Sequence, residues 1–259
     1  MKKLYILSEN KLNALIQKRV NEHIKHMNKD YEREILKKQV DIATLQNQIN
    51  PHFLYNSLEC IRGQAILNNA PEIAEITLAL SKFFRYGIST KSDIVTLREE
   101  LDSINNYMKI QQFRFKDSFS LAIDYDKNEP EILDALLPKL TFQPIIENAI
   151  NHGFSSMVKQ AMIHIEIIHT KKHLNINISD NGQGMDTDTL LNLNKRLESD
   201  ENLRPFLDNQ SKNNGLALYN INKRIKLIFG EEYGIHVSSI PNIGTDVEIQ
   251  VPYKVNDKS

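Results

Sequence analysis

The sequence has few of the residues that build covalent or metal-stabilised folds. It has no tryptophan and a single cysteine, Cys60, among 259 residues. One cysteine excludes an internal disulfide and a metal site made of clustered thiolates. We interpret Cys60 itself as a small buried apolar residue. With 41% hydrophobic and 25% charged residues, the composition is that of an ordinary globular protein.

The sequence also lacks net charge and long apolar runs. Its formal net charge is −1, so no whole-protein field draws it to nucleic acid, and we expect no nucleic-acid partner. No stretch approaches 18 consecutive apolar residues, and the apolar run at the start of the chain is too short for a signal peptide. We therefore expect a cytoplasmic chain.

Residues 1–40 are locally basic, with ten Lys/Arg against five Asp/Glu. A solvated helix face and a segment lying just under a membrane both fit this excess, and charge alone does not separate them.

Glycine and proline are absent from residues 11–49, which predicts one long helix. Its apolar residues follow a near-heptad spacing that predicts pairing with a second copy of the chain: Ile24, Met27, Tyr31, Ile35, Ile42, Leu45 and Ile49. Helices are also predicted from Ser57 to about Asn68 and over 72–87, with a break before Pro71. Residues 41–90 therefore read as a helical hairpin, and two hairpins would make a four-helix bundle.

The pattern changes in the second half. A helix is predicted over 94–115, and alternating segments predict strands at 119–125, 163–169, 174–179, 235–240 and 247–251. Further helices are expected at about 131–152, 187–198 and 215–229, and the polar stretch 199–214 is long enough to be a functional loop or lid. This order predicts an α+β domain with a mixed sheet covered by helices on one face.

The segment QINPHFLYNSL, residues 48–58, interrupts the first helical region. Asn50 and Pro51 should break the helix or start a new turn, and His52 follows directly. A kink with a surface histidine and a nucleophilic histidine both fit these eleven residues.

Four polar or glycine-containing motifs follow in the second half. They are Glu147-Asn148 with Asn151-His152-Gly153, Asp180-Asn181-Gly182-Gln183-Gly184, Asn214-Gly215-Leu216 and Asn242-Ile243-Gly244-Thr245. Asn148 and His152 are four residues apart and would share a helix face. Asn181-Gly182 also suits a hairpin turn, whereas Gly215 would begin a helix whose N-terminus suits an anion. Taken singly, each motif is weak, but their order is specific.

That order resembles the ATP-binding domain shared by histidine kinases, gyrase and Hsp90. Together with QINPHFLYNSL, LREELDSINNYMKIQQFRF and FQPIIENAINHG, it resembles the LytS/YesM group of bacterial sensor histidine kinases over about residues 41–252. The fold that this implies is a helical coil and a dimeric four-helix-bundle hairpin followed by an α/β-sandwich ATP-binding domain.

The resemblance implies a role for each matched residue. His52 is the expected phosphoacceptor, with Glu147 as a second catalytic residue and Asn148 as the Mg²⁺ ligand. The remaining expected ATP-binding residues are Asn151, His152, Asp180, Gly182, Gly184, Gly215, Leu216 and Thr245. Asp180 would accept from the adenine amine, and Gly215 with the amides after it would cradle phosphates. Asn220 and Arg224 resemble a polar pair of the group, although a surface helix pair explains them equally well.

The chain departs from the family pattern at Ala217 and Asn242, where glycine is usual. Asparagine tolerates a positive φ, whereas Ala217 adds a Cβ beside the phosphate loop.

The resemblance implies an ATP- and Mg²⁺-dependent kinase that phosphorylates His52 and passes the phosphoryl group to an aspartate of a response regulator receiver domain. We expect a homodimer with a helical coil at 1–40, phosphotransfer helices at 41–116 and an ATP-binding domain at 117–255. Attachment to the inner face of the membrane would come only from segments that this chain lacks. A nucleotide-binding scaffold without phosphotransfer and an ATPase without phosphohistidine are the alternatives.

Overall fold

A computed structural model describes residues 51–88, 92–116, 118–153, 161–198 and 215–255. The chain divides into two units, Met1–Leu54 and Tyr55–Ser259. The elements described below belong to the second unit, apart from the first four residues of α2. The expected heptad seam from Ile24 to Ile49, Asn50 and the polar stretch 199–214 lie outside the described residues.

The expected helical hairpin is present in α2 (Pro51–Leu67) and α3 (Pro71–Ile88). Proline suits the first turn of a helix, where its missing N–H costs no hydrogen bond. Asn69 has φ 54° in the turn between the helices. The Tyr55 hydroxyl donates to the Phe84 carbonyl at 3.5 Å, which joins the two helices. The predicted break and restart of the helix are confirmed.

The interpretation of Cys60 as a buried residue is wrong, because its side chain is exposed. The reason is that α2 buries only Leu58 and Ala65 among its described residues. The hairpin consequently exposes five large apolar side chains, Phe53, Ile61, Ile66, Leu67 and Ile73.

The connecting helix, α4 (Leu97–Phe115), begins three residues later than the sequence predicted. Thr96 accepts from the Glu99 N–H and Glu99 accepts from the Thr96 N–H, which is a capping box that fixes the first turn. The residues before it form a short strand, β1 (Ile94–Thr96), that pairs antiparallel with β3 (Leu136–Pro138). This two-stranded sheet was not predicted.

The single helix predicted over 131–152 is wrong. The segment contains a 3₁₀ helix η1 (Pro130–Asp134), strand β3, helix α5 (Gln143–Asn148) and a π-helical turn η2 (Ala149–Gly153). Proline lacks the N–H and crowds the preceding turn, so Pro138 and Pro144 exclude one continuous helix here. Leu140, with φ 59°, supplies the backbone reversal between β3 and α5.

The main sheet has five strands in the order β2-β4-β5-β7-β6. β2 runs parallel to β4 and the other neighbours are antiparallel, so the sheet is mixed as predicted. The strands are β2 (Phe119–Asp124), β4 (Ala161–His169), β5 (His173–Asp180), β6 (Gly234–Ile240) and β7 (Gly244–Pro252).

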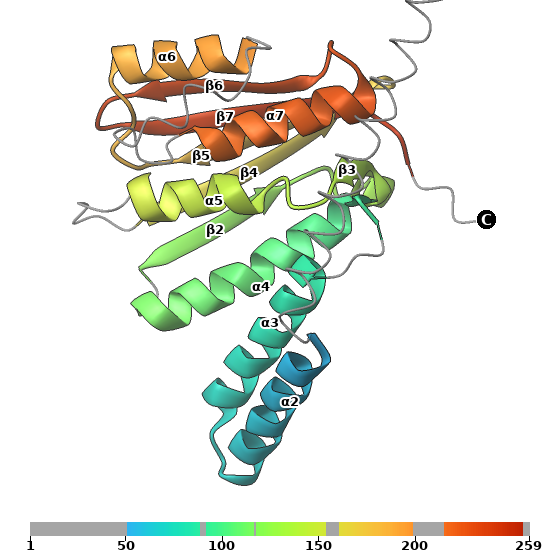
Figure 1. Ribbon diagram of the computed structural model, residues 1–259, viewed down its shortest axis with the longest axis vertical. Coiled ribbons are helices and arrows are strands. Elements are labelled where there is room, and N and C mark those ends of the chain that lie inside the picture. Colours follow the sequence, from blue (N-terminus) through green and yellow to red (C-terminus); the bar gives the residue numbers. More distant parts are fainter. Residues whose placement is uncertain (1–50, 89–91, 117, 154–160, 199–214, 256–259) are drawn as a thin grey trace, which may run out of the picture. The chain divides into compact units, whose positions relative to one another are not determined.

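Helices cover one face of this sheet, as Figure 1 shows for α5, α6 (Thr187–Glu198) and α7 (Leu216–Phe229). β4 illustrates the reason, because Ile163, Ile165 and Ile167 are buried whereas the residues between them are not. The period of two therefore places one apolar face against the helices. The α+β class with one covered sheet face is confirmed.

Side-chain amides bind backbone groups on both outer strands. On β2, the Gln112 amide donates to the Phe119 carbonyl at 3.0 Å. On β6, the Asn222 side-chain oxygen accepts from the Ile235 N–H at 2.9 Å, and the Asn194 amide donates to the Val237 carbonyl at 2.8 Å.

Candidate functional site

Asp180 lies at the end of β5, the central strand of the sheet, opposite Thr245 of β7. Its carboxylate accepts from the Gly182 N–H at 2.8 Å, which fixes its orientation. Burial raises the pKa of Asp180, the N–H groups of Gly182 and Thr245 oppose that rise, and nearby Asp246 adds to it. The result is a partly buried acceptor at a strand end, and the predicted hairpin turn at Asn181-Gly182 is not formed.

Two glycines allow the Asp180 loop to lie against the β6–β7 turn. Gly184 has φ 64°, and a Cβ there would stand 2.1 Å from the Ile240 carbonyl oxygen. Gly244 has φ 149°, and its Cβ would stand 1.9 Å from the Asp180 carbonyl oxygen. The Asn242 N–H donates to the Gln183 carbonyl at 2.7 Å. The second and fourth motifs, far apart in sequence, therefore form one backbone layer.

Asn242 adopts the positive φ that its place in the motif suggested, at 62°. Asparagine reaches this region more readily than most residues, so it replaces glycine here at small cost.

Ser239 is a site residue that the sequence reasoning missed. Its hydroxyl accepts from the Met185 N–H at 2.8 Å and donates to the Gly244 carbonyl at 2.8 Å. It also lies 3.0 Å from the Thr245 hydroxyl. Ser239 thus orients Thr245, and a serine in an alternating strand carries no motif that would reveal this.

The first motif lies on α5 and the π-helical turn after it. Glu147 accepts from the Gln143 side-chain amide at 2.8 Å, Asn148 is half-buried and Asn151 is exposed. Asn148 and His152 do not share an α-helical face, because the α-helix ends at Asn148 and the π turn changes the spacing. Such turns are frequent at functional sites. The His152 side chain lies outside the described residues.

The third motif begins α7 at the end of the polar stretch. Gly215 is the N-cap residue with φ 96° and provides no side-chain cap, so the first-turn N–H groups retain capacity for an anion. A Cβ at Gly215 would stand 2.9 Å from Leu193 Cδ1, which adds a packing reason for glycine. Leu216 and Ala217 are half-buried in this first turn.

Asn220 and Arg224 do not act as a surface pair. Asn220 is exposed, whereas the Arg224 guanidinium donates to the Leu140 carbonyl at 3.1 Å and is partly buried. Arg224 therefore connects α7 to the segment before α5.

These motif-bearing elements lie together in the second unit. α5 contacts α7, and η2 contacts β7, which carries Gly244 and Thr245. His52, in the first turn of α2, belongs to the first unit and is exposed.

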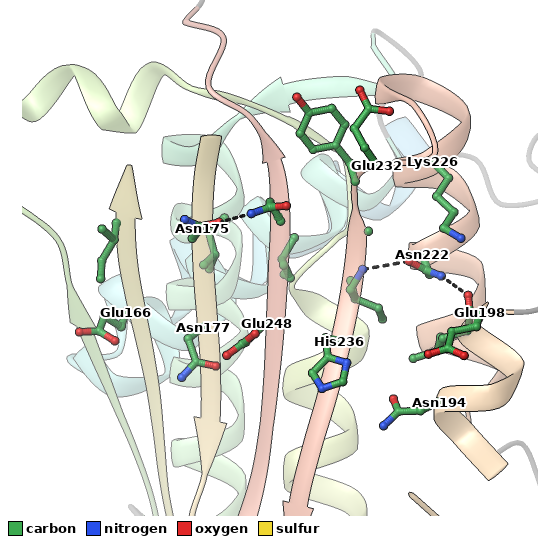
Figure 2. Close-up of a pocket in the computed structure, with 18 residues that line it drawn as sticks. Glu166, Asn175, Asn177, Asn194, Glu198, Asn222, Lys226, Glu232, His236 and Glu248 are labelled. Carbon is green, nitrogen blue, oxygen red and sulfur yellow. Dashed lines mark hydrogen bonds between the residues drawn. The ribbon is translucent and has the colours of Figure 1, made fainter. Parts of the chain in front are cut away.

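A separate cavity of about 580 Å³ lies elsewhere on the domain, and none of the predicted nucleotide residues line it. Figure 2 shows Glu166, Asn177, Glu248 and His236 on successive strands of the sheet, with Asn194 and Asn222 from α6 and α7. Its chemistry is distinct from that of the four motifs, and we assign it no function.

The described part of the chain has neither a clustered metal site nor a membrane-spanning helix. No group of three or more His, Cys, Asp or Glu side chains is arranged to hold a metal ion there. None of the described helices is both long and apolar enough to cross a membrane.

Two sequence families match the chain. Residues 40–119 match the family described as histidine kinase. Residues 134–255 match the family described as histidine kinase-, DNA gyrase B-, and HSP90-like ATPase. The fold and the four motifs thus define an ATPase domain of this superfamily preceded by a histidine kinase helical hairpin.

Several curated relatives match both regions. The chain is 36% identical over 239 residues to the sensor histidine kinase YesM of Bacillus subtilis, covering 92% of this chain and 37% of that protein. It is 34% identical over 220 residues to the sensor protein LytS of Oceanobacillus iheyensis, covering 85% of this chain and 35% of that protein. It is 31% identical over 222 residues to the sensor histidine kinase YpdA of Escherichia coli, covering 85% of this chain and 35% of that protein.

The chain belongs to the LytS/YesM type of sensor histidine kinases. It spans little more than a third of the length of these relatives.

Proposed function

We propose that this chain is an ATP-dependent protein histidine kinase that phosphorylates His52 and then transfers the phosphoryl group to an aspartate of a response regulator receiver domain. The observation that supports it best is the Asp180 carboxylate, partly buried at the end of the central strand beside Thr245. An acceptor in that environment suits the exocyclic amine of adenine.

The first turn of α7 suits the other end of the nucleotide. Its N–H groups have no side-chain cap at Gly215, and the helix dipole favours negative charge at this end. An adenine at Asp180 and phosphates at α7 would place the triphosphate beside α5, which contacts α7. We assign Asn151, His152 and Leu216 to the phosphate side, and Gly182, Gly184 and Thr245 to the adenine side.

Asn148 is the residue that we assign to Mg²⁺. Its half-buried amide oxygen is a hard ligand, and Mg²⁺ usually takes one or two protein ligands together with phosphate oxygens and water. The absence of a multi-residue metal cluster among the described residues is compatible with such a shared site. When bound, the ion would neutralise charge on the triphosphate.

The reaction that we propose forms a bond between a ring nitrogen of His52 and the γ-phosphorus and breaks the bond between that phosphorus and the β,γ-bridging oxygen. ADP leaves with the electron pair. The protein contributes mainly positioning and charge stabilisation. An exposed histidine meets the steric need of an attacking group, and Glu147 at the end of α5 is the second catalytic residue that we propose.

The chain is expected to act as a homodimer through its N-terminal helices. The large apolar side chains that α2 and α3 expose support this, since pairing with a second hairpin would bury them. We propose that the chain acts on the cytoplasmic side of the membrane.

Labelling with γ-³²P-ATP tests the function. Wild type should incorporate acid-labile, base-stable label, and His52→Gln should incorporate none while it still binds ATP. His236→Gln, which changes an exposed histidine on β6, is the matched control and should label normally. Undiminished labelling of His52→Gln would refute the assignment. ATP binding without label would favour a scaffold, and ATP hydrolysis without label would favour a simple ATPase.

A further inference from the structure

Glu100 is a charged residue almost completely removed from water. It lies on α4 and is 1% exposed. One carboxylate oxygen accepts from the Tyr86 hydroxyl of α3 and from the Leu140 N–H, the latter at 2.5 Å. The other oxygen accepts from the Thr141 N–H at 3.0 Å and the Phe142 N–H at 2.9 Å. All four partners are donors, so the geometry is that of an ionised carboxylate.

The three N–H groups converge because of the backbone at Leu140. Its φ of 59° is left-handed, and a left-handed residue beside right-handed ones gathers successive N–H groups into an anion-binding nest. Thr141 is fully buried, and its hydroxyl donates to the Pro138 carbonyl at 2.5 Å. The nest is thus held by its own chain, and Glu100 occupies it from a helix about 40 residues away in sequence.

The nest is also the beginning of α5. Phe142 is the N-cap residue of that helix and has no side-chain capping bond. Glu100 instead holds the N-cap residue itself and the two residues before it, through their N–H groups. On the other side of the turn, Arg224 of α7 holds the Leu140 carbonyl at 3.1 Å. The segment that leads into α5 is consequently fixed by α4 and by α7 together.

Electrostatics agree with this arrangement. Burial raises the pKa of Glu100, and the bonds from Phe142, Tyr86, Leu140 and Thr141 oppose that rise. Burial, followed by the Glu100 charge, raises the pKa of Tyr86, so the tyrosine stays protonated and remains a donor.

We propose that Glu100 is a positioning residue for the ATP site, which sets the start of the helix carrying Glu147 and Asn148 and ties it through Tyr86 to α3 of the phosphoacceptor hairpin. This inference rests on the proposed function, because it assigns Glu100 to the same nucleotide site. Glu100 itself acts only through the backbone of α5.

Variants of the full chain at Glu100, Tyr86 and Asp102 test the proposal. Glu100→Gln keeps the size of the side chain but turns one end into an NH₂ group that faces N–H donors. Tyr86→Phe removes one hydroxyl and leaves the three nest bonds in place. Asp102→Asn changes an exposed carboxylate two residues further along α4 and is the control. Each is measured by Mg·ATP titration and by amide hydrogen exchange, neither of which requires phosphoryl transfer.

We expect Glu100→Gln to weaken ATP binding at least tenfold and to speed amide exchange selectively over residues 140–151. Tyr86→Phe should shift both in the same direction by two- to fivefold, and Glu100→Asp should recover part of the affinity. Asp102→Asn should match wild type. Should Glu100→Gln fail to fold, Tyr86→Phe decides the question on its own.

Unchanged ATP affinity in a folded Glu100→Gln or in Tyr86→Phe would overturn the proposal. Faster exchange spread evenly over the sheet would overturn it too, since that indicates a purely structural role. A wild type that binds ATP but leaves His52 unlabelled would refute the proposed function and leave this inference standing. A wild type that binds no ATP would refute both.

Discussion

Asp180, the acceptor that we propose for adenine, has a cost in stability, because burial raises its pKa above the ordinary value of 3.8. The native state then holds the proton more tightly than the unfolded chain. By linkage, the contribution of Asp180 to stability is greatest below the unfolded pKa and declines as pH rises through the folded pKa.

Asp180→Asn should therefore melt at a higher temperature than wild type at pH 7, and the difference should vanish near pH 4. The same variant should bind ATP about 10- to 100-fold more weakly, because it loses a hydrogen bond to a charged group. Calorimetry across pH together with ATP titration measures both effects. A melting temperature of Asp180→Asn that stays above that of wild type at low pH would contradict the burial explanation.

Gly184 is one of the two glycines, with Gly244, whose substitution should be most damaging to the site. Gly184→Ala would place a Cβ 2.1 Å from the Ile240 carbonyl oxygen at a positive φ, and we expect destabilisation of roughly 1–3 kcal/mol. Gly63→Ala in α2 is the control, since its Cβ meets nothing within 4 Å and should be neutral or stabilising by about 0.5–1 kcal/mol. Urea unfolding compares the two, and equal effects would contradict the close-approach argument.

At the scale of the elements, α7 carries one of the two departures from the family pattern. Ala217 lies in its first turn, beside the N–H groups proposed to hold phosphates. Ala217→Gly should bind ATP as well as or better than wild type, at a cost of at most about 1 kcal/mol of helix stability. Nucleotide titration with circular dichroism checks this. A clear loss of affinity in a folded variant would show that the Ala217 Cβ belongs to the working site.

The elements that could be predicted from the sequence are those whose signal lies within the element itself. Strict alternation of isoleucines identified β4 and β5, and Pro71 identified the restart of α3. The segment 131–152 was misread because an apolar stretch of that length fits a helix unless proline geometry is given more weight. The order of the motifs made Asp180 and Gly215 candidate site residues. The turn before α5 depends on Glu100, which no local pattern connects to Leu140.

The exposed apolar face of α2 and α3 predicts where two copies meet. Ile61 is 51% exposed, and Ile61→Glu should raise the dimer dissociation constant at least tenfold because a charge would be buried at the interface. Leu227→Glu on α7, where the side chain is 76% exposed, is the control and should not change association. Light scattering or sedimentation measures both, and equal behaviour of the two variants would contradict the hairpin interface.

For the whole molecule, mixing two inactive variants determines whether transfer occurs within or between subunits. His52→Gln retains the ATP site, and Asn148→Asp, expected to lose Mg²⁺-dependent ATP binding, retains the acceptor. Label on the Asn148→Asp chain after subunit exchange means transfer between subunits, and no label with verified exchange means transfer within one. A monomer at micromolar concentration that still labels itself would contradict the dimer.

The amide side chains on the outer strands have a consequence for how copies of this chain can associate. Gln112 occupies a carbonyl of β2, and Asn222 and Asn194 occupy an N–H and a carbonyl of β6. A foreign strand would have to displace these bonds before it could pair there, so the sheet resists growing into a continuous ribbon with its neighbours. A chain that we propose to act as a homodimer is thereby protected from aggregation through its sheet edges, and replacing either asparagine should first be seen as turbidity on storage.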